Sequence, residues 1–254
     1  MTVDELIRLL TAMQASGLPQ QLEAHGLNLA VFEPWTALTD SILAAWVAFW
    51  AAYLFSRANG SRPVTLWACS FLASAISSLA GVAFHGTRIV LTSTATIAII
   101  WKVVPVATAV ATLCLGWAAA IIWLRPALRR IAVALLFVEF ACCVGATFLL
   151  AAPQANSFNV VLFDSVPVLI AILIGCALHW NDGSARWIAA GVLTAFVAGG
   201  VQASKWHHGN PPDHNDIFHV IQMAAMYLLY RGGALLPSSS TETVTAGATE
   251  LATA

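Results

Sequence analysis

Apolar residues recur along the chain in long runs that are separated by short polar segments. Each run is about 20 residues long, which is enough for an α-helix to cross the roughly 30 Å of hydrocarbon in a bilayer. The breaks contain turn-forming residues, such as Asn59-Gly60 and Asn181-Asp182-Gly183. The pattern predicts an all-α polytopic membrane protein, a seven-transmembrane-helix bundle with spans at 34–56, 63–86, 97–123, 128–151, 158–180, 186–206 and 215–235.

The segments on either side of this predicted transmembrane domain, 34–235, have a different character. Residues 1–33 begin with a stretch in which leucines and isoleucine alternate with Asp4, Glu5 and Arg8, which is typical of an amphipathic segment on the membrane surface. Residues 236–254 are rich in Ser, Thr and Ala, and we expect them to form a disordered tail.

Composition narrows the class of protein further. Hydrophobic residues make up 59% of the chain and charged residues 9%, whereas a soluble domain is about 25% charged. The formal net charge is -1 and no basic patch occurs, so nucleic acid is not an expected partner. We expect an integral protein of the plasma membrane, or of the inner membrane in a bacterium, with membrane lipid as its surroundings.

The distribution of basic residues predicts the orientation of the bundle. Most arginines fall at one set of predicted helix ends, namely Arg57, Arg62, Arg125, Arg129, Arg130, Arg186 and Arg231. The opposite ends hold Arg88 and Lys205, with Arg8 further away. The positive-inside rule therefore predicts an amino terminus outside and a carboxyl terminus in the cytoplasm, which agrees with an odd number of spans.

With this topology, polar residues from most helices fall near the outer ends. They are Glu33, Asp40, His85, Lys102, Asp164, Gln202, His207, His208, Asp213, His214, Asn215, Asp216 and His219. Ionisable groups within a membrane normally face the interior of the bundle and pair with one another. The sequence therefore predicts a polar cavity that opens toward the outside.

Two local patterns single out residues for chemistry. Asn215 and Asp216 precede His219 by four and three residues, so the three lie on one helical face that can hold a metal ion. In the second predicted helix a stripe of small and polar residues ends in an imidazole, and its members are Ser74, Ser78, Gly81 and His85. Small residues there let a helix or a ligand approach closely.

These residues make the chain resemble the CREST superfamily of seven-helix membrane proteins, which includes alkaline ceramidases and the progestin and adipoQ receptors. The resemblance rests on Ser77 or Ser78 ahead of Phe84-His85-Gly86, on Glu33 with Asp40, and on Asn215-Asp216-Ile217-Phe218-His219 followed by Tyr227 and Gly232. It implies a zinc ion held among a serine, an aspartate and histidines of the second, third and seventh helices. In the ceramidases this ion serves to cleave a lipid amide.

The chain departs from the family pattern at three places. Asn215 stands where the family commonly has a histidine, and Gly81 stands where it has a serine. The third helix has no acid in the stretch from Thr92 to Thr96, so Asp164 or Asp216 would have to replace the usual aspartate.

The resemblance and the spacing together suggest one arrangement for catalysis. His85 and His219 are the first two candidate zinc ligands, and His214 or His208 is the third, with an open position for water. Asp216 or Asp164 would handle the proton, and Ser78 would bind the oxyanion.

Each of these residues also has a structural interpretation. His85 and His219 can belong to a buried hydrogen-bond network, and the loop histidines can be solvent-exposed. Lys102 can pair with Glu139 or Asp164 inside the bundle. Glu33 and Asp40 can bind a hard cation, although Glu33 before Pro34 also suits the start of a helix.

Three functions follow from these alternatives. The first is a metal-dependent hydrolase of a lipid amide or ester, and the second is a noncatalytic ligand-binding or sensing protein with an incomplete metal site. The third, a proton-coupled transporter, would use Glu139, Asp164 and Lys102. A retinal protein is excluded by resemblance, because the lysines, Lys102 and Lys205, both lie outside the last helix.

Overall fold

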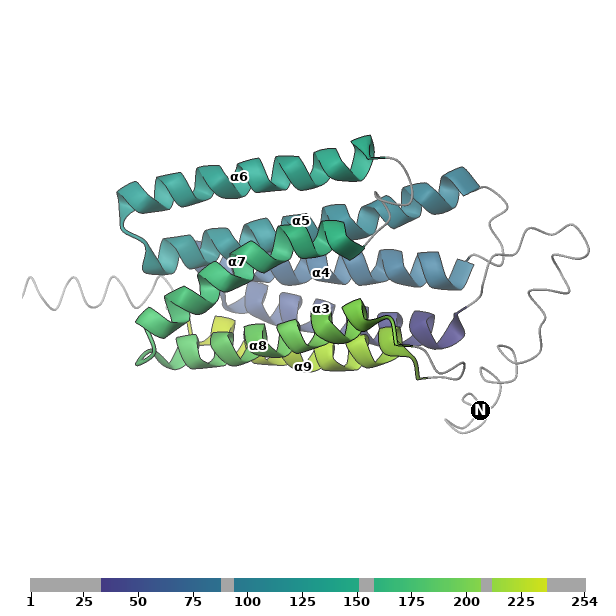
Figure 1. Ribbon diagram of the computed structural model, residues 1–254. Helices are drawn as coiled ribbons and strands as arrows, with labels where there is room; N and C mark the ends of the chain where they lie inside the picture. The colour runs from purple at the N-terminus through teal and green to yellow at the C-terminus, as the bar shows by residue number, and fades with distance from the viewer. Residues whose placement is uncertain (1–32, 88–93, 151–157, 207–211, 237–254) are drawn as a thin grey trace, which may run out of the picture.

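The computed structural model describes residues 33–87, 94–150, 158–206 and 212–236, and these residues form an all-helical bundle without a strand (Figure 1). Its helices are α3 (Pro34–Arg57), α4 (Arg62–Thr87), α5 (Thr94–Trp123), α6 (Pro126–Leu149), α7 (Phe158–Leu178), α8 (Gly183–Ser204) and α9 (His214–Ala234). The predicted surface segment before residue 33, the predicted tail after residue 236, and His207 and His208 lie outside the described residues.

Every predicted helix is present, and each predicted boundary lies within three residues of the observed one. Pro34 and Pro126 stand in the first turn of α3 and α6, where a missing backbone N–H costs nothing. Between α3 and α4, Asn59 and Gly60 have φ of 43° and 79°, a left-handed conformation that these two residue types tolerate. Local turn chemistry therefore sets several of the helix ends.

Six of the seven helices, α3 to α8, are long and apolar enough to cross a membrane. Helix α9 has 21 residues but does not meet the same standard of apolarity. Its first turns are polar because they carry His214, Asn215, Asp216 and His219. The structure thus supports six membrane-crossing helices, and the crossing by α9 stays a prediction, as does the orientation of the bundle.

Successive helices run antiparallel to one another, and α6 lies at the margin of the bundle (Figure 1). Within the described part of the chain α6 packs against α5 and α7 alone, whereas α4 packs against α3, α5 and α9. Large side chains that are fully buried, among them Leu54, Trp67, Phe71 and Ile188, fill the space between α3, α4, α8 and α9.

Helices α8 and α9 approach each other closely at two glycines. A Cβ atom on Gly191 would lie 2.7 Å from Cγ of Leu229, and one on Gly232 would lie 2.4 Å from Cγ1 of Ile188. Glycine at such points lets helix backbones meet, which is a common way of packing helices in membranes. These contacts hold the last turns of α9 against α8.

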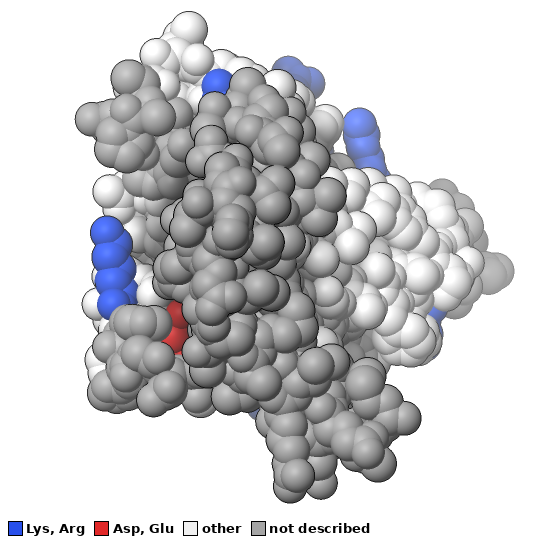
Figure 2. All heavy atoms as spheres, turned by 90° about the vertical axis from the view of Figure 1, so that its right-hand side faces the viewer, with Lys and Arg blue, Asp and Glu red and all other residues white. Residues whose placement is uncertain are grey.

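The two ends of the bundle differ in charge. The end where α3 stops and α4 starts carries the arginines that the sequence placed together, including Arg57, Arg62 and Arg129. The opposite end contains Glu33, His85 and the start of α9. Viewed onto that opposite end, a small acidic patch is visible (Figure 2).

Candidate functional site

A cavity of about 280 Å³ lies between α3, α4, α5, α7, α8 and α9, and we call it the six-helix cavity. Part of its wall is polar, with Asp40, Ser74, Ser77, Ser78, His85, Thr108, Ser165, Gln202, Asn215, His219 and Gln222. The rest is apolar, with side chains such as Leu43, Val47, Leu162, Phe196 and Met226. The cavity is therefore amphiphilic, as ligand sites commonly are.

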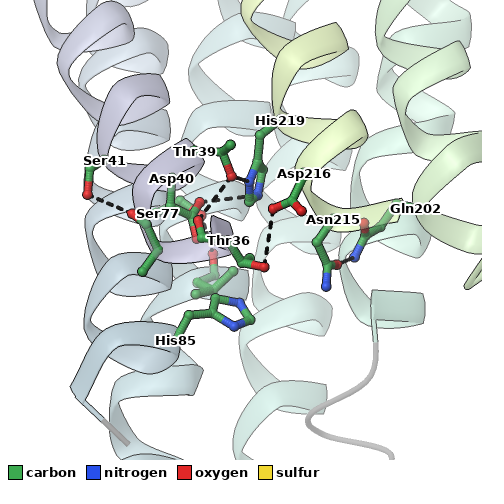
Figure 3. Close-up of polar contacts among 12 residues, drawn as sticks. Thr36, Thr39, Asp40, Ser41, Ser77, His85, Gln202, Asn215, Asp216 and His219 are labelled. Carbon is green, nitrogen blue, oxygen red and sulfur yellow. Dashed lines mark hydrogen bonds and ion pairs between the residues drawn. The ribbon is translucent and has the colours of Figure 1, made fainter. Parts of the chain in front are cut away.

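The centre of the polar wall is a buried pair formed by Asp40 of α3 and His219 of α9 (Figure 3). Oδ1 of Asp40 lies 3.2 Å from Nε2 of His219, and the two residues are 4% and 6% exposed. On the other side of the ring, Nδ1 lies 2.8 Å from Oγ1 of Thr39. Both ring nitrogens of His219 are thus in contact with α3.

The contacts of Thr39 link its hydroxyl to the protonation of His219. The Thr39 hydroxyl lies 3.1 Å from the carbonyl oxygen of Thr36 and 2.8 Å from Nδ1 of His219, and when its single hydrogen goes to the carbonyl, Oγ1 accepts a hydrogen bond from Nδ1–H. Nε2 then faces Asp40 with one proton between the two atoms, either as a neutral carboxylic acid with a neutral imidazole or as a carboxylate with an imidazolium. In both states the pair carries no net charge, which suits its burial.

Gly81 of α4 makes room for the Asp40 carboxyl. A Cβ atom at position 81 would lie 2.5 Å from Oδ2 of Asp40 and 2.9 Å from its Cγ, distances that real Cβ contacts do not reach. The residue that departs from the serine of the CREST pattern is therefore in contact with the acid of the pair. Gly81 belongs to the small stripe predicted on this helix, and at this position the stripe accommodates the Asp40 side chain of α3.

His85, at the last turn of α4, also lines the six-helix cavity. Its Nδ1 lies 2.7 Å from Oε2 of Glu33, which is within ion-pair distance, although the angles are not those of a hydrogen bond. Glu33 directly precedes Pro34 at the start of α3. Glu33 thus stands at a helix start, as expected, and the hard cation expected with Asp40 stays a prediction.

The polar start of α9 is held by a capping box. The Asp213 carboxylate accepts hydrogen bonds from the N–H groups of Asn215 at 2.8 Å and Asp216 at 3.3 Å, and the N–H of Asp213 donates to Oδ2 of Asp216 at 3.0 Å. An acid three residues after an Asp N-cap is a common way to satisfy the free N–H groups of a helix start.

Two side-chain contacts connect this helix start to its neighbours. Thr36 of α3 donates to Oδ1 of Asp216 at 3.4 Å, and Nε2 of Gln202 on α8 donates to Oδ1 of Asn215 at 2.7 Å (Figure 3). Asp216 is therefore a capping residue in contact with α3, and its carboxylate is engaged on both oxygens. Asn215, predicted as an altered ligand position, is part of the cavity wall.

Two of the predicted residues, Asp164 and His214, lie elsewhere. Asp164 is 1% exposed and lies beside Thr112 of α5 and Cys143 of α6, outside the described lining of the six-helix cavity. His214 Nδ1 lies 2.9 Å from the carbonyl oxygen of Trp206. Asp164 does not line the six-helix cavity, because its face of α7 turns toward α5 and α6, and the proton-handling role expected of it stays a prediction.

The predicted ion pair of Lys102 with Glu139 or Asp164 is also wrong. The Lys102 ammonium lies 5.0 Å from the centroid of the Phe148 ring, and no described carboxylate forms an ion pair with it. Glu139 lies in a different hollow, between α5, α6 and α7. Depth along the helices suggested these pairs, but the helices present the side chains to different neighbours.

The zinc ion implied by the CREST resemblance needs three or four ligands around one point. Among the described residues no three His, Cys, Asp or Glu side chains form a group that could hold a metal ion. Both nitrogens of His219 contact α3, and His208 lies outside the described ranges. The described residues do not by themselves supply a full ligand set, and the zinc site stays a prediction.

The sequence reasoning missed Thr36 and Thr39, which bind Asp216 and His219 respectively. Thr36 and Asp40 follow Glu33 at steps of three and four residues, so a polar stripe along α3 was visible in the sequence. Thr39 gave no comparable signal, because a helical threonine usually bonds its own backbone.

The family comparison covers most of the helical bundle. A family of unknown function, DUF6962, matches residues 35–237, from the first turn of α3 to just beyond α9. No curated protein and no solved structure matches the chain. The matched range contains Asp40, Gly81, His85 and His219 but starts after Glu33. The chain therefore belongs to the DUF6962 family.

Proposed function

We propose that this protein is an integral membrane protein that binds a small amphiphilic molecule in the six-helix cavity. The observation that carries the proposal is the buried Asp40–His219 pair in the wall of a cavity whose other walls are largely apolar. A buried pair of this kind normally faces partners that satisfy its remaining hydrogen-bonding capacity. The polar group of a ligand would supply such a partner.

The lining residues indicate the chemistry of the ligand. Asp40 and His219 are paired with each other, and the remaining polar wall consists mainly of hydroxyl and amide groups such as Ser78, Gln202 and Gln222. Hydroxyl and amide groups can both donate and accept. We therefore propose a ligand with a neutral polar group, an amide or an alcohol, attached to a short apolar chain.

The volume sets an upper limit on the ligand. Ligand pockets usually measure about 300–1,000 Å³, so a cavity of about 280 Å³ is at the small end of this range. A complete lipid with two acyl chains does not fit. A single short chain or the head of a larger lipid does.

The proposal includes the predicted membrane topology. Helix α9 crosses the bilayer as a seventh span, and the arginine-rich end lies in the cytoplasm. The six-helix cavity then lies toward the outer face, and the ligand enters from that side or from the outer leaflet.

A photoreactive probe can test this proposal. Purified protein in lipid nanodiscs is labelled with an N-hexyl amide that carries a diazirine, and the labelled residues are mapped by mass spectrometry. We expect labels on α3, α4 and α9 at cavity positions, and an excess of non-reactive N-hexylacetamide should remove them.

Two neighbouring glycines of α8 provide matched variants for the same experiment. Gly199 lines the cavity, and a Cβ atom there meets Leu162 at an ordinary 3.9 Å, whereas a Cβ atom on Gly200 meets nothing within 4 Å. Gly199→Met should fill the cavity and abolish specific labelling, and Gly200→Met should not. Equal labelling of the two variants, or labels confined to lipid-facing positions, would show that the cavity is not the binding site.

Hydrolysis of a lipid amide or ester with a bound metal ion is the second candidate function. It is favoured by the presence of His85, His219 and Ser78 on the wall of one cavity. Metal analysis of purified wild type beside His85→Ala and His219→Ala tests it. One equivalent of metal in wild type that is lost in both variants supports hydrolysis, and no metal in wild type, or a full equivalent in both variants, refutes it.

A further inference from the structure

A second cavity, of about 470 Å³, lies at the opposite end of the bundle, and we call it the arginine cavity. Its lining comes from α4, α5 and α6 and consists of Arg62, Trp117, Ile121, Arg129, Arg130, Val133, Ala134 and Phe137. The six-helix cavity shares none of these residues. From the sequence, Arg62, Arg129 and Arg130 were used only to predict which end of the bundle lies in the cytoplasm.

The charge of the arginine cavity is not neutralised by the described residues. No described carboxylate forms an ion pair with Arg62, Arg129 or Arg130. The Arg62 guanidinium instead lies 5.6 Å from the centroid of the Trp117 ring. Of the described acids, Asp182 is at this end of the bundle, and it lies 4.0 Å from His179. Three guanidinium groups around one hollow therefore have no anionic partner among the described residues.

The other lining residues are apolar and lie further into the bundle. Ile121 lies in the last turn of α5 and Trp117 about two turns from its end, and Val133 and Phe137 are about two and three turns from the start of α6. The rings of Trp117 and Phe137 are in edge-to-face contact, with centroids 5.6 Å apart. The hollow thus has a cationic rim at the helix ends and an apolar wall within the predicted span.

We propose that the arginine cavity binds an anionic membrane phospholipid. Arg62, Arg129 and Arg130 hold its phosphate, and Trp117, Ile121 and Phe137 contact the first part of an acyl chain. Arginine matches phosphate oxygens with two parallel N–H groups, and basic pockets between transmembrane helices at the cytoplasmic side bind anionic head groups. Inorganic phosphate would leave the apolar wall without a contact, whereas a phospholipid contacts both the arginines and the apolar wall. The inference rests on the orientation included in the proposed function, which puts the arginine-rich end in the cytoplasm, and it does not depend on the ligand of the six-helix cavity.

Native mass spectrometry of the purified full-length protein tests the proposal. The protein is equilibrated in mixed micelles with phosphatidylglycerol or phosphatidylcholine, and bound lipids are counted. We expect one phosphatidylglycerol to remain bound and phosphatidylcholine to be lost. Each basic residue near the membrane surface contributes about 1 kcal/mol to binding of anionic lipid, so Arg129→Gln with Arg130→Gln should weaken phosphatidylglycerol binding about thirtyfold.

The matched control removes the same charge from the same end of the bundle. Arg125 and Arg186 are exposed and do not line the arginine cavity, so Arg125→Gln with Arg186→Gln should leave the bound phosphatidylglycerol in place. Equal losses in the two double variants would mean that general surface charge attracts the lipid, and equal retention of the two lipids by wild type would overturn the proposal as well.

Three further measurements separate the possible outcomes. If the double glutamine variant does not fold, Arg129→Lys with Arg130→Lys keeps the charge and removes the paired N–H groups, and it should still weaken binding. Phe137→Ala should reduce binding of phosphatidylglycerol, and inorganic phosphate at millimolar concentration should not compete. Competition by phosphate together with an unaffected Phe137→Ala variant would show a plain anion site and refute a lipid site.

Discussion

In the buried Asp40–His219 pair, the position of one proton decides which hydrogen bonds the two side chains form. Nδ1 of His219 is in contact with Thr39, so Nε2 depends on Asp40 for a partner. Asp40→Asn keeps this partner, because the amide N–H donates to Nε2 of a neutral imidazole. Asp40→Ala leaves Nε2 buried without a hydrogen bond, which costs about 1–3 kcal/mol.

Thermal unfolding of the purified variants, followed by tryptophan fluorescence, checks this prediction. We expect Asp40→Asn to unfold close to the wild-type temperature and Asp40→Ala clearly below it. If both variants lose the same stability, the pair is an ion pair that needs the carboxylate charge.

Gly81 gives a second prediction at the scale of single residues. Gly81→Ala places a methyl group 2.5 Å from Oδ2 of Asp40, so the carboxyl must leave Nε2 of His219. Overpacking of this kind costs about 1–3 kcal/mol. In the control Gly86→Ala, on the same helix, the new methyl group meets Cβ of Ala37 at 3.6 Å, and its unfolding temperature should stay near that of wild type.

A double variant identifies the cause of the loss. Asp40→Ala removes the carboxyl that Gly81→Ala would strike, so Gly81→Ala should cost little in that background. An undiminished cost in the double variant would show that the methyl group strikes something other than Asp40.

Part of the site was predictable from single residues and part was not. Asp40, His85, Gln202, Asn215 and His219 were expected to meet, and they line one cavity, because polar groups in a membrane bundle gather away from lipid. The partner of each was not predictable. Thr39 meets His219 across 180 residues of sequence, and that contact depends on how α3 packs on α9.

At the scale of helices, the sequence predicted where each helix begins and ends better than it predicted which neighbour each helix face contacts. Long apolar runs bounded by Pro, Gly and Asn locate a helix, because the bilayer demands a fixed length. Which neighbour a given face meets depends on packing between helices. Asp164 and Lys102 illustrate this, since both lie at plausible depths but face Cys143 and Phe148 instead of the predicted partners.

The contact between α8 and α9 carries a prediction at this scale. Gly232→Ala places a methyl group 2.4 Å from Cγ1 of Ile188 and 3.1 Å from its backbone nitrogen, and backbone atoms cannot rotate away. The helices must separate, so we expect a loss of about 1–3 kcal/mol in stability.

Gly200 of α8 is the control, because nothing lies within 4 Å of a Cβ atom there. Gly200→Ala should be neutral or should stabilise the helix, since alanine favours a helix over glycine by about 0.5–1 kcal/mol. Similar unfolding temperatures for Gly232→Ala and Gly200→Ala would contradict the close approach of α8 and α9.

For the whole molecule, the separation of charge between the two ends links its two cavities. The six-helix cavity lies among acids and histidines, and the arginine cavity lies at the basic end. The sequence predicted this separation from counts of arginine at helix ends. It did not predict the arginine cavity, because grouping Arg62 with Arg129 and Arg130 requires α4 and α6 to pack on neighbouring sides of α5.

The orientation of the bundle and the crossing by α9 can be tested together. A cysteine-free background receives a single cysteine at Ala127 in the first turn of α6, at Ser204 at the end of α8, or at Leu235 just after α9. All three positions are exposed. In intact cells a membrane-impermeant maleimide should label Ser204→Cys, while Ala127→Cys and Leu235→Cys should react only after the membrane is broken.

Labelling of Leu235→Cys together with Ser204→Cys in intact cells would mean that α9 does not cross, and labelling of Ala127→Cys in intact cells would reverse the orientation. The proposed topology places the six-helix cavity toward the outer face of the membrane and the arginine cavity toward the cytoplasmic face. A reversed orientation would therefore move the amphiphile site to the cytoplasmic side. It would also take the arginine cavity away from the leaflet in which basic pockets bind anionic lipid.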